Sequence, residues 1–540
     1  MLSGEAALAE TPNDGPLRLF IGVLHARRLD HDQAVPHLRR AADLLPENPL
    51  PRIELARALA GAGRPDEAEA AIAGLAGKGP VAGELARLRA CVAEAQAAAG
   101  RGEASLAAAR AQARILPYDP AVRVAIARLE DLLGRPEKAE AALDEALLLD
   151  PGCAPALLAL ADLAERANRL DALEALLARA AAVGIPATDT MLLTARLRYR
   201  RGDLAGALAA AQAAPRSGDG GARAELIGRI LDRKGDPAAA FAAFAEMNRE
   251  AGSVVPNARA AARLYREEIA RTAALVTPGW HGSWTALPPP ARPAPVFLLG
   301  FPRSGTTLLD TMLAGHDEVV VLEERPVLEA AARALGGQDR LASLDAAQIE
   351  ALRSRYFEAL DAAAPDARGR LVVDKMPLGL TCVPLIHRLF PEARIIFAER
   401  HPCDVVLSGF MVRFDPRGGM ANFLDLEDTA LLYDRIMRLW QNCRAALPLA
   451  VHRVRYERLV ADPEAELRPL AAFLGLGWDG RLLDHRATAR DRGHIGSASY
   501  AQVTEPVHMR ASERWRRYRA QLVPILPILS PWAEQLGYDL

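Results

Sequence analysis

Two patterns of hydrophobic and polar residues divide the chain. Up to about residue 270, apolar residues recur at helical spacing in a sequence dominated by Ala, Leu, Arg and Glu. This pattern predicts a succession of amphipathic helices. Beyond residue 294, short apolar runs such as 296–300 (VFLLG) and 371–375 (LVVDK) alternate with helical stretches. The alternation predicts an α/β domain with a mainly parallel sheet.

The helical part repeats with a period close to 34 residues. Segments similar to GRPEKAEAALDEALLLDP recur along this part of the chain. Four of them end at Pro46, Pro80, Pro117 and Pro151, and further units begin at Asn168, Gly202 and Gly235. The period resembles the tetratricopeptide repeat, a helix-turn-helix unit. The resemblance implies an all-α solenoid over residues 15–271 that binds a peptide or a partner protein on its concave surface. An alanine-rich bundle without a groove is the alternative.

The boundaries follow from composition. Residues 272–293 are rich in proline, which cannot continue a helix, so we expect a linker there. This places an N-terminal tail at residues 1–14 and the second domain at residues 294–540.

Charge and cysteine content exclude several classes of protein. The net charge of −2 gives no overall attraction to nucleic acid or to an anionic membrane. The five cysteines are scattered and form no pair at metal-ligand spacing. No apolar run reaches the roughly 18 residues that a membrane span needs. We therefore expect a cytoplasmic protein without a membrane span, a nucleic-acid partner or a metal.

The segment from Val296 to Leu313 carries the clearest chemical signal. It reads as a buried strand, a turn bracketed by Gly300 and Gly305, and the start of a helix. Such a turn directs backbone N–H groups and the positive end of the helix dipole at an anion. The glycines have the spacing of a nucleotide P-loop, but Thr306 stands where nucleotide-hydrolysing families place lysine. An ordinary strand-turn-helix and a degenerate kinase loop are the alternatives.

The sequence GFPRSGTT resembles the 5′-phosphosulfate loop of the sulfotransferase family, whose motif contains PRSGTT. The resemblance implies that the co-substrate is 3′-phosphoadenosine 5′-phosphosulfate, abbreviated PAPS, and that no metal is needed. It assigns the 5′-phosphosulfate to the loop residues Arg303, Ser304, Gly305, Thr306 and Thr307.

Three further segments resemble the same family. ARIIFAERHPCDVVLSGF places Arg400 and Ser408 at the family's 3′-phosphate site. A third arginine of the tyrosine-sulfating members corresponds to Val412 here. VRYERLV implies that Tyr456 lies near the nucleoside, and SYAQVTEPVHMRASERWRRY implies that Ser499 helps to hold the co-substrate.

Two segments supply candidates for the transfer itself. HDEVVVLEERPVL resembles the stretch that carries the catalytic glutamate of tyrosylprotein sulfotransferases, and it implicates Glu323 with Glu324 as the adjacent contender. VVDKMPL resembles their lysine motif and places Lys375 at the tip of a strand. Glu323 would be the general base. Lys375 and Arg303 would stabilise the transferring group.

These resemblances imply a P-loop-like sulfotransferase that acts on an acceptor hydroxyl, with the repeats recruiting the acceptor or a partner protein. No histidine lies in the motif of the small-molecule branch, which favours the tyrosylprotein-like branch. Protein tyrosine, a polysaccharide hydroxyl and a small alcohol or phenol all fit as acceptors. The alternatives are a repeat scaffold with a catalytically silent domain, and a P-loop kinase.

Overall fold

A computed structural model describes residues 7–8, 11–27, 30–62, 64–75, 85, 88–89, 92–93, 102–215, 220–285, 289–491 and 512–540. Its contacts divide the chain into two compact units, unit 1 from Met1 to Ala210 and unit 2 from Ala211 to Leu540. Each unit is described by itself.

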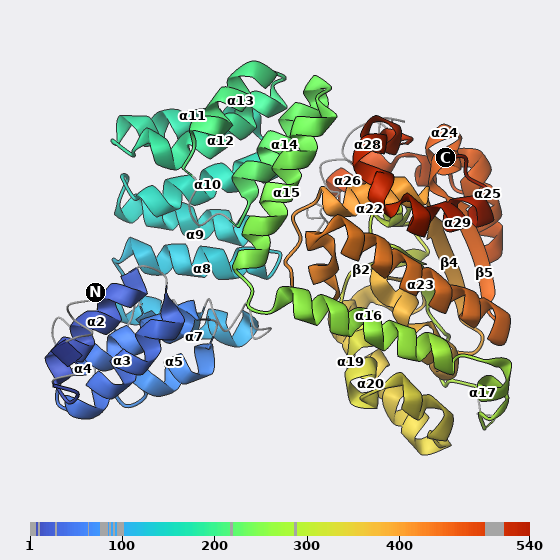
Figure 1. The fold of residues 1–540 in the computed structure, drawn as a ribbon, viewed down its shortest axis with the longest axis horizontal. Coiled ribbons are helices and arrows are strands. Elements are labelled where there is room, and N and C mark those ends of the chain that lie inside the picture. The colour runs from blue at the N-terminus through green and yellow to red at the C-terminus, as the bar shows by residue number, and fades with distance from the viewer. Residues whose placement is uncertain are drawn as a thin grey trace. The chain divides into compact units, whose positions relative to one another are not determined.

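Unit 1 consists of helices that pair with their neighbours along the chain, as Figure 1 shows for α8 to α11. Several begin with proline in the first turn, where its missing N–H is not needed. The helices are α2 (Gly15–Arg27), α3 (His31–Leu44), α4 (Pro49–Gly61), α5 (Pro65–Ile72), α7 (Gly102–Ile115), α8 (Pro120–Leu132), α9 (Pro136–Leu149), α10 (Ala154–Arg166), α11 (Leu170–Ala182), α12 (Ala187–Arg200) and α13 (Leu204–Ala213). The predicted all-α repeat region is confirmed.

Ion pairs between successive repeats follow the period of the sequence. Arg166 of α10 lies 2.7 Å from Asp131 of α8, and Arg200 of α12 lies 3.0 Å from Glu165 of α10. Both pairs join residues 35 positions apart. Such partly exposed pairs contribute less than about 1 kcal/mol each. They mark the register of the repeats, while buried Ala and Leu side chains between the helices form the core.

Unit 2 begins with three helices that the sequence assigns to the solenoid, α14 (Ala222–Lys234), α15 (Pro237–Ser253) and α16 (Ala258–Leu275). Asn248 of α15 is buried and donates to the carbonyl oxygen of Phe410 at 2.9 Å. Phe241 stacks on the same phenylalanine, with 4.9 Å between ring centroids. Arg266 of α16 pairs with Asp428 at 2.8 Å. Through these contacts, α14 to α16 pack against the sheet domain. The domain boundary at residue 271 stays a prediction from the sequence.

The sheet of unit 2 has five strands in the order β2-β3-β1-β4-β5, and every neighbouring pair is parallel. The strands are β1 (Val296–Gly300), β2 (Val319–Glu323), β3 (Leu371–Lys375), β4 (Arg394–Glu399) and β5 (Ala450–Arg455). The predicted α/β domain with a mainly parallel sheet is therefore confirmed. Because parallel strands end at one edge, β1, β2 and β3 bring Gly300, Glu323 and Lys375 to the same side of the sheet.

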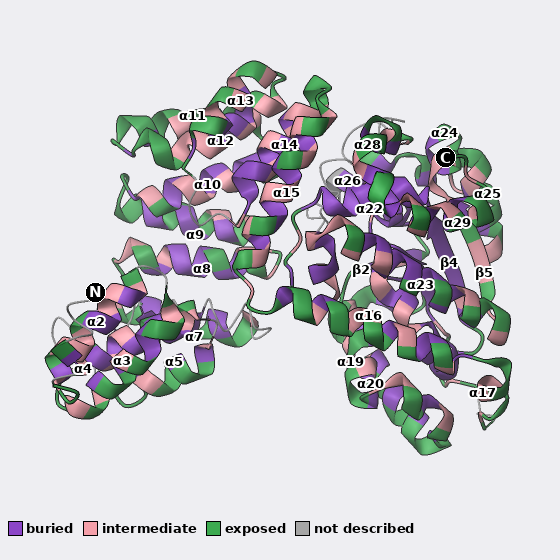
Figure 2. Cartoon of the chain, viewed as in Figure 1, coloured by how far each residue is buried: buried purple, intermediate pink, exposed green. Residues whose placement is uncertain are grey.

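Helices cover both faces of this sheet. Phe297 and Leu299 of β1 join a core with α21 to α23, whereas Val296 and Leu298 join a second core with α18 and α25. Figure 2 shows α22 and β4 as buried elements. The helices are α17 (Pro278–Gly282), α18 (Thr306–Leu313), α19 (Val327–Leu335), α20 (Ala346–Ala363), α21 (Val383–Leu389), α22 (Pro402–Phe410), α23 (Leu426–Ala446), α24 (Tyr456–Ala461), α25 (Pro463–Leu474), α26 (His485–Asp491), α28 (Arg519–Leu522) and α29 (Leu526–Leu536). The 3₁₀ helices are η2 (Gln338–Ser343), η3 (Pro365–Ala367), η4 (Pro377–Cys382), η5 (Gly418–Leu424), η6 (Gly480–Leu483), η8 (Arg514–Tyr518) and η9 (Val523–Ile525).

Candidate active site

Two glycines shape the loop between β1 and α18. Gly305 has a φ of 96°, and a Cβ at this position would lie 2.5 Å from the ring of Tyr456. A Cβ on Gly300 would lie 2.7 Å from the carbonyl oxygen of Ala398. Arg303 also has a left-handed backbone, with a φ of 76°, which few residues other than glycine adopt. The loop therefore turns tightly into α18, whose first N–H groups form the kind of site that binds anions.

Hydroxyl groups surround the start of α18. Ser304, Thr306 and Thr307 are buried, and the Oγ atom of Ser304 has no hydrogen-bond partner among the described residues. Leaving a buried polar atom unpaired costs about 1–3 kcal/mol. An oxyanion bound by the loop would remove that cost. Thr306 and Thr307 line a neighbouring cavity together with Arg303 and Gly305.

Four of the predicted residues meet beside this loop. Nε of Arg303 donates to Oγ of Ser408 at 3.1 Å, and Nη1 of Arg400 donates to the carbonyl oxygen of Arg303 at 2.9 Å. The guanidinium of Arg400 lies 4.6 Å from the ring centroid of Tyr456. Burial and, after it, the positive charge of Arg400 lower the pKa of Arg303 to about 10. Two guanidinium groups held this close favour a bound anion.

Lys375 is fully buried at the end of β3 among three carboxylates. Its Nζ atom lies 2.8 Å from Glu324, 3.2 Å from Asp310 and 3.5 Å from Glu323. Burial lowers the pKa of this ammonium group, but Asp310, Glu324 and Glu323 together outweigh burial and raise the pKa above its ordinary value. The three carboxylates therefore favour the charged form of Lys375, whose ion pairs join α18, the end of β2 and β3.

The two neighbouring glutamates at the end of β2 differ in exposure. The side chain of Glu323 is 10% exposed and that of Glu324 is 42% exposed. Glu324 has a φ of 49°, and its N–H donates to the carbonyl oxygen of Lys375 at 2.9 Å. This bend turns Glu324 into the cavity wall. Of the two candidates, Glu324 is thus the one that lines the cavity.

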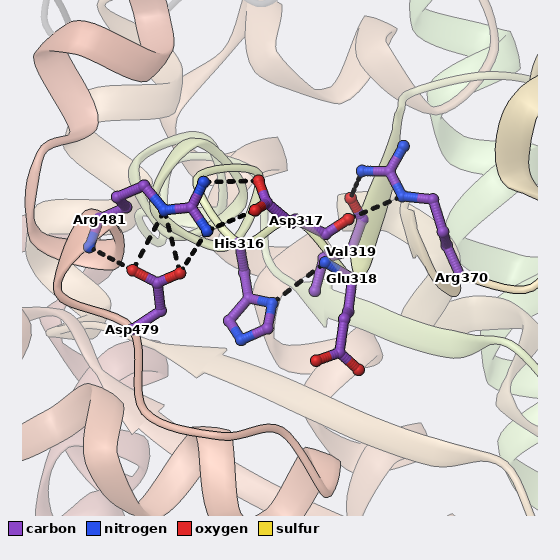
Figure 3. A network of polar contacts seen from close by, with 7 residues as sticks. All are labelled: His316, Asp317, Glu318, Val319, Arg370, Asp479 and Arg481. Atoms are coloured by element: carbon purple, nitrogen blue, oxygen red, sulfur yellow. Dashed lines mark hydrogen bonds and ion pairs between the residues drawn. The ribbon is translucent and has the colours of Figure 1, made fainter.

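The other end of β2 is fixed by the polar network in Figure 3. Arg481 of η6 pairs with both Asp317 and Asp479 at 2.5 Å. Arg370 donates to the carbonyl oxygens of Asp317 and Val319 at 2.9 and 2.6 Å. The hydrogen bonds from Arg481 lower the pKa of Asp479 to about 2, so this pairing persists in mild acid. The network holds the strand that presents the two glutamates.

The cavity has a volume of about 800 Å³ and extends from the loop to helix α16. That helix contributes four residues to its wall: Tyr265, Glu268, Ile269 and Thr272. Apolar side chains form much of the remainder, among them Leu328, Met376, Leu378, Phe414 and Met420. His485 also lines the cavity. Neither α16 nor His485 was singled out from the sequence, because nothing local to these residues signals a distant cavity.

The remaining sequence-predicted positions have different outcomes. Ser499 lies outside the described residues. Val412, at the place of a third arginine, is buried, while the neighbouring Arg413 pairs with Glu225 of α14 at 3.5 Å. Among the described residues, no cluster of metal-binding side chains occurs. No helix within the described ranges is both long and apolar enough to cross a lipid bilayer.

Comparison with protein families gives two matches. Residues 295–480 match the model of the sulfotransferase family, and residues 29–90 match the model of the tetratricopeptide repeat.

Individual relatives align with about 45% of the chain. An uncharacterized protein of Aquifex aeolicus is 28% identical over 255 residues, which is 33% of its own length. The chain thus spans about a third of that relative. Protein-tyrosine sulfotransferase 2 of Gallus gallus is 25% identical over 258 residues, which is 69% of its length. Protein-tyrosine sulfotransferase 1 of Homo sapiens is 26% identical over 275 residues, also 69% of its length. Among solved structures, the sulfotransferase domain of the Synechococcus PCC 7002 olefin synthase is 25% identical, with a TM-score of 0.35 over 47% of this chain and 100% of that domain.

Proposed function

Because the chain carries a sulfotransferase-family domain together with a tetratricopeptide repeat region, we propose that it transfers a sulfuryl group from PAPS to an acceptor hydroxyl. One observation carries the proposal. Arg303 lines the cavity and also donates a hydrogen bond to Ser408, so the two proposed anion sites would adjoin beside a cavity whose wall includes the carboxylate of Glu324. PAPS has an anionic group at each end of its ribose and needs such a pair of sites.

The residues around the loop fit this co-substrate. Ser304 has a buried hydroxyl without a hydrogen-bond partner in the part of the chain that the structure describes, and Gly305, lacking a Cβ, lets the ring of Tyr456 pack directly against the loop. We assign the 5′-phosphosulfate to residues 303–307, and the 3′-phosphate to Arg400 and Ser408. Tyr456 packs against Arg400 and would lie beside the nucleoside. The assignment of Ser499 stays a prediction.

For the chemical step we assign the general base to a carboxylate that pairs with Lys375 and lines the cavity. The acceptor O–H would give its proton to a carboxylate while its oxygen bonds to sulfur and the bond from sulfur to the 5′-phosphate oxygen breaks. Glu324 lines the cavity and is favoured over the predicted Glu323, which stays a candidate. Lys375 would hold this carboxylate in place. For Lys375 to contact the transferring group as predicted, its ammonium group would have to break an ion pair with one of the three carboxylates. Arg303 and the loop N–H groups would stabilise negative charge on the leaving group.

We propose a phenolic hydroxyl, including that of protein tyrosine, as the acceptor. The cavity combines apolar walls with a few polar groups, the composition that binds an aromatic ring. Similarity to protein-tyrosine sulfotransferases supports this choice. The repeat region would recruit the acceptor or a protein that delivers it, as repeat arrays of this kind commonly bind peptides.

The test uses the full chain with PAPS labelled at the sulfuryl group. A tyrosine peptide, a small phenol and an oligosaccharide are offered separately as acceptors, and binding of adenosine 3′,5′-bisphosphate is measured in parallel. We expect label in the peptide or the phenol and loss of nucleotide binding in Arg303→Ala. Absence of both transfer and nucleotide binding would overturn the proposal, whereas binding without transfer to any acceptor would favour a catalytically silent domain.

A further inference from the structure

Helix α16 forms part of the cavity wall, although it precedes the residues that match the sulfotransferase family model. Among its wall residues, Tyr265, Ile269 and Thr272 are spaced by four and three positions, so they share one side of the helix. That side therefore faces the space in which the proposed reaction would take place.

Polar contacts fix α16 against the sheet domain at two points. Arg266 pairs with Asp428 of α23 at 2.8 Å and also donates to Oδ1 of Asn422. Near the end of the helix, Asn442 of α23 donates to the carbonyl oxygen of Ala273 at 2.8 Å. Figure 1 shows α16 and α23 side by side within unit 2. Sliding or rotating the helix would break these contacts, so the residues on its cavity side are held in place.

The ring of Tyr265 packs against Gly419 of η5. A Cβ at residue 419 would lie 2.8 Å from atoms of this ring, so a larger residue would have to displace it. The carbonyl oxygen of Gly419 accepts a hydrogen bond from Nδ2 of Asn422 at 2.9 Å, and the same asparagine is bonded to Arg266. One network therefore holds both the helix that carries the tyrosine and the glycine that makes room for it.

Tyr265 belongs to a different part of the cavity wall from the proposed co-substrate site. That site is built from the loop before α18, the end of β4 and the start of α24, whereas the neighbours of Tyr265 come from η4 and η5. Leu378 of η4 flanks the same glycine, since its Cδ1 atom would lie 3.2 Å from a Cβ at residue 419. Leu378 and Met420 both line the cavity beside Tyr265. This apolar part of the wall is thus left for the acceptor.

The tyrosine is suited to an apolar contact rather than to proton transfer. Burial raises the pKa of its hydroxyl above the ordinary value, so the side chain stays neutral. Its ring would therefore act on the acceptor through shape, while the proposed base, Glu324, takes the proton.

We propose that Tyr265 determines acceptor specificity, because its ring limits the width of the aromatic group that the cavity admits. The proposal deepens the proposed function and rests on it. The cavity would accept phenols with a single ring, which include the side chain of protein tyrosine, and disfavour phenols with two fused rings. Selection among acceptors would then be made by a helix outside the part of the chain that matches the family model.

The test compares two acceptors of the same chemistry and different width, 4-methylphenol and 2-naphthol. kcat/KM of the full chain is measured for each with labelled PAPS, and the affinity for adenosine 3′,5′-bisphosphate is measured in parallel. We expect Tyr265→Ala to raise the ratio of kcat/KM for 2-naphthol over 4-methylphenol about tenfold, because the second ring gains the space of the lost side chain. Tyr265→Phe keeps the ring and should change this ratio by less than about twofold.

Leu264→Ala is the matched control, because Leu264 is the neighbouring residue of α16, is 56% exposed and lies outside the cavity wall. It should leave the ratio as in the wild type. Nucleotide affinity should stay unchanged in all variants. If Tyr265→Ala no longer binds the nucleotide, Tyr265→Leu takes its place and should shift the ratio in the same direction.

The outcomes separate this proposal from the proposed function. An unchanged ratio in a Tyr265 variant that still binds the nucleotide overturns the role of Tyr265 and leaves the proposed function standing. An equal loss for both phenols also overturns that role, because it indicates a general effect on the fold. If the wild type sulfates a tyrosine peptide but neither phenol, only the role of Tyr265 fails. If it transfers to no acceptor and binds no nucleotide, both proposals fail.

Discussion

The Nζ atom of Lys375 lies 2.8 Å from Oε1 of Glu324, and only the glutamate reaches the cavity. The lysine has no exposed surface, whereas the side chain of Glu324 is 42% exposed. The pair therefore keeps a positive charge inside the protein and a carboxylate oxygen at the place where an acceptor hydroxyl would bind. The predictions below begin with this pair.

Replacing Glu324 with Gln should lower kcat for sulfuryl transfer by about 10²–10⁴-fold, because it removes the proposed proton acceptor while keeping its size. Glu323→Gln is the matched variant and should retain most of the activity, since its side chain lies behind the cavity wall. Steady-state kinetics with a phenolic acceptor, together with unchanged nucleotide affinity, would check this. A large loss in Glu323→Gln with little loss in Glu324→Gln would show that the original sequence-based choice of Glu323 is correct.

Lys375→Met should destabilise unit 2 by roughly 3–5 kcal/mol, because it leaves three carboxylates without their buried cation. Unit 2 can be followed selectively, since all six tryptophans of the chain lie in it. Urea unfolding monitored by tryptophan fluorescence is therefore the measurement. Adding Glu323→Gln to Lys375→Met should recover part of the stability; no recovery would argue that the carboxylates do not depend on the lysine charge.

Gly305→Ala should impair nucleotide binding and cost more than about 1 kcal/mol of stability, because the left-handed backbone and the ring of Tyr456 both oppose a Cβ. Gly477→Ala is the control, since a Cβ there meets no atom within 4 Å. That variant should stay within about 0.5 kcal/mol of the wild type. Calorimetric titration and tryptophan-monitored unfolding of both variants would check the expectation, which equal behaviour of the two alanines would contradict.

Asp374 should make stability depend on pH. Burial raises its pKa to about 7, against a hydrogen bond from Tyr356 that lowers it. Between about pH 4 and pH 7 the folded state keeps this proton and the unfolded state releases it, so the contribution of Asp374 to stability falls as pH rises. The fall is at most about 1.4 kcal/mol per pH unit. The Asp374→Asn variant has no carboxyl group to titrate at this position. Its free energy of unfolding relative to that of the wild type should therefore rise as pH increases from about 4 to 7 and stay constant above pH 7. A constant difference in urea midpoint from pH 4.5 to 7.5 would contradict the prediction.

A chain that starts at residue 211 should fold and bind adenosine 3′,5′-bisphosphate, whereas one that starts at residue 294 should not. The shorter chain lacks the hydrogen bond from Asn248, the stacking of Phe241 and the cavity wall formed by α16. Tryptophan fluorescence and nucleotide titration would compare the two chains. Full affinity in the chain from residue 294 would show that α14 to α16 are dispensable for the site.

Local sequence was sufficient to predict the strands and the tight turn between β1 and α18. The apolar runs gave the five strands, and the glycines around Arg303 gave the turn into a helix, because both features depend on residues close together in the chain. The sequence also singled out Lys375 and the two glutamates.

Contacts between distant segments could not be predicted. Asp310 lies inside α18 with no local sign that it meets Lys375, and the choice between Glu323 and Glu324 depends on a backbone bend that follows β2. The membership of α14 to α16 in unit 2 was hidden because their helical periodicity continues that of the repeats.

The ion pairs of unit 1 have a consequence for the length of the array. Arg166 with Asp131 and Arg200 with Glu165 join equivalent positions of neighbouring units. Deleting one whole unit would therefore bring Arg200 opposite Asp131 and restore an arginine-aspartate contact, whereas a deletion of half a unit would face each arginine with an unrelated side chain. Loss or gain of a complete unit thus preserves these contacts, so the array can change its length in steps of one unit without leaving an arginine opposite an unrelated side chain.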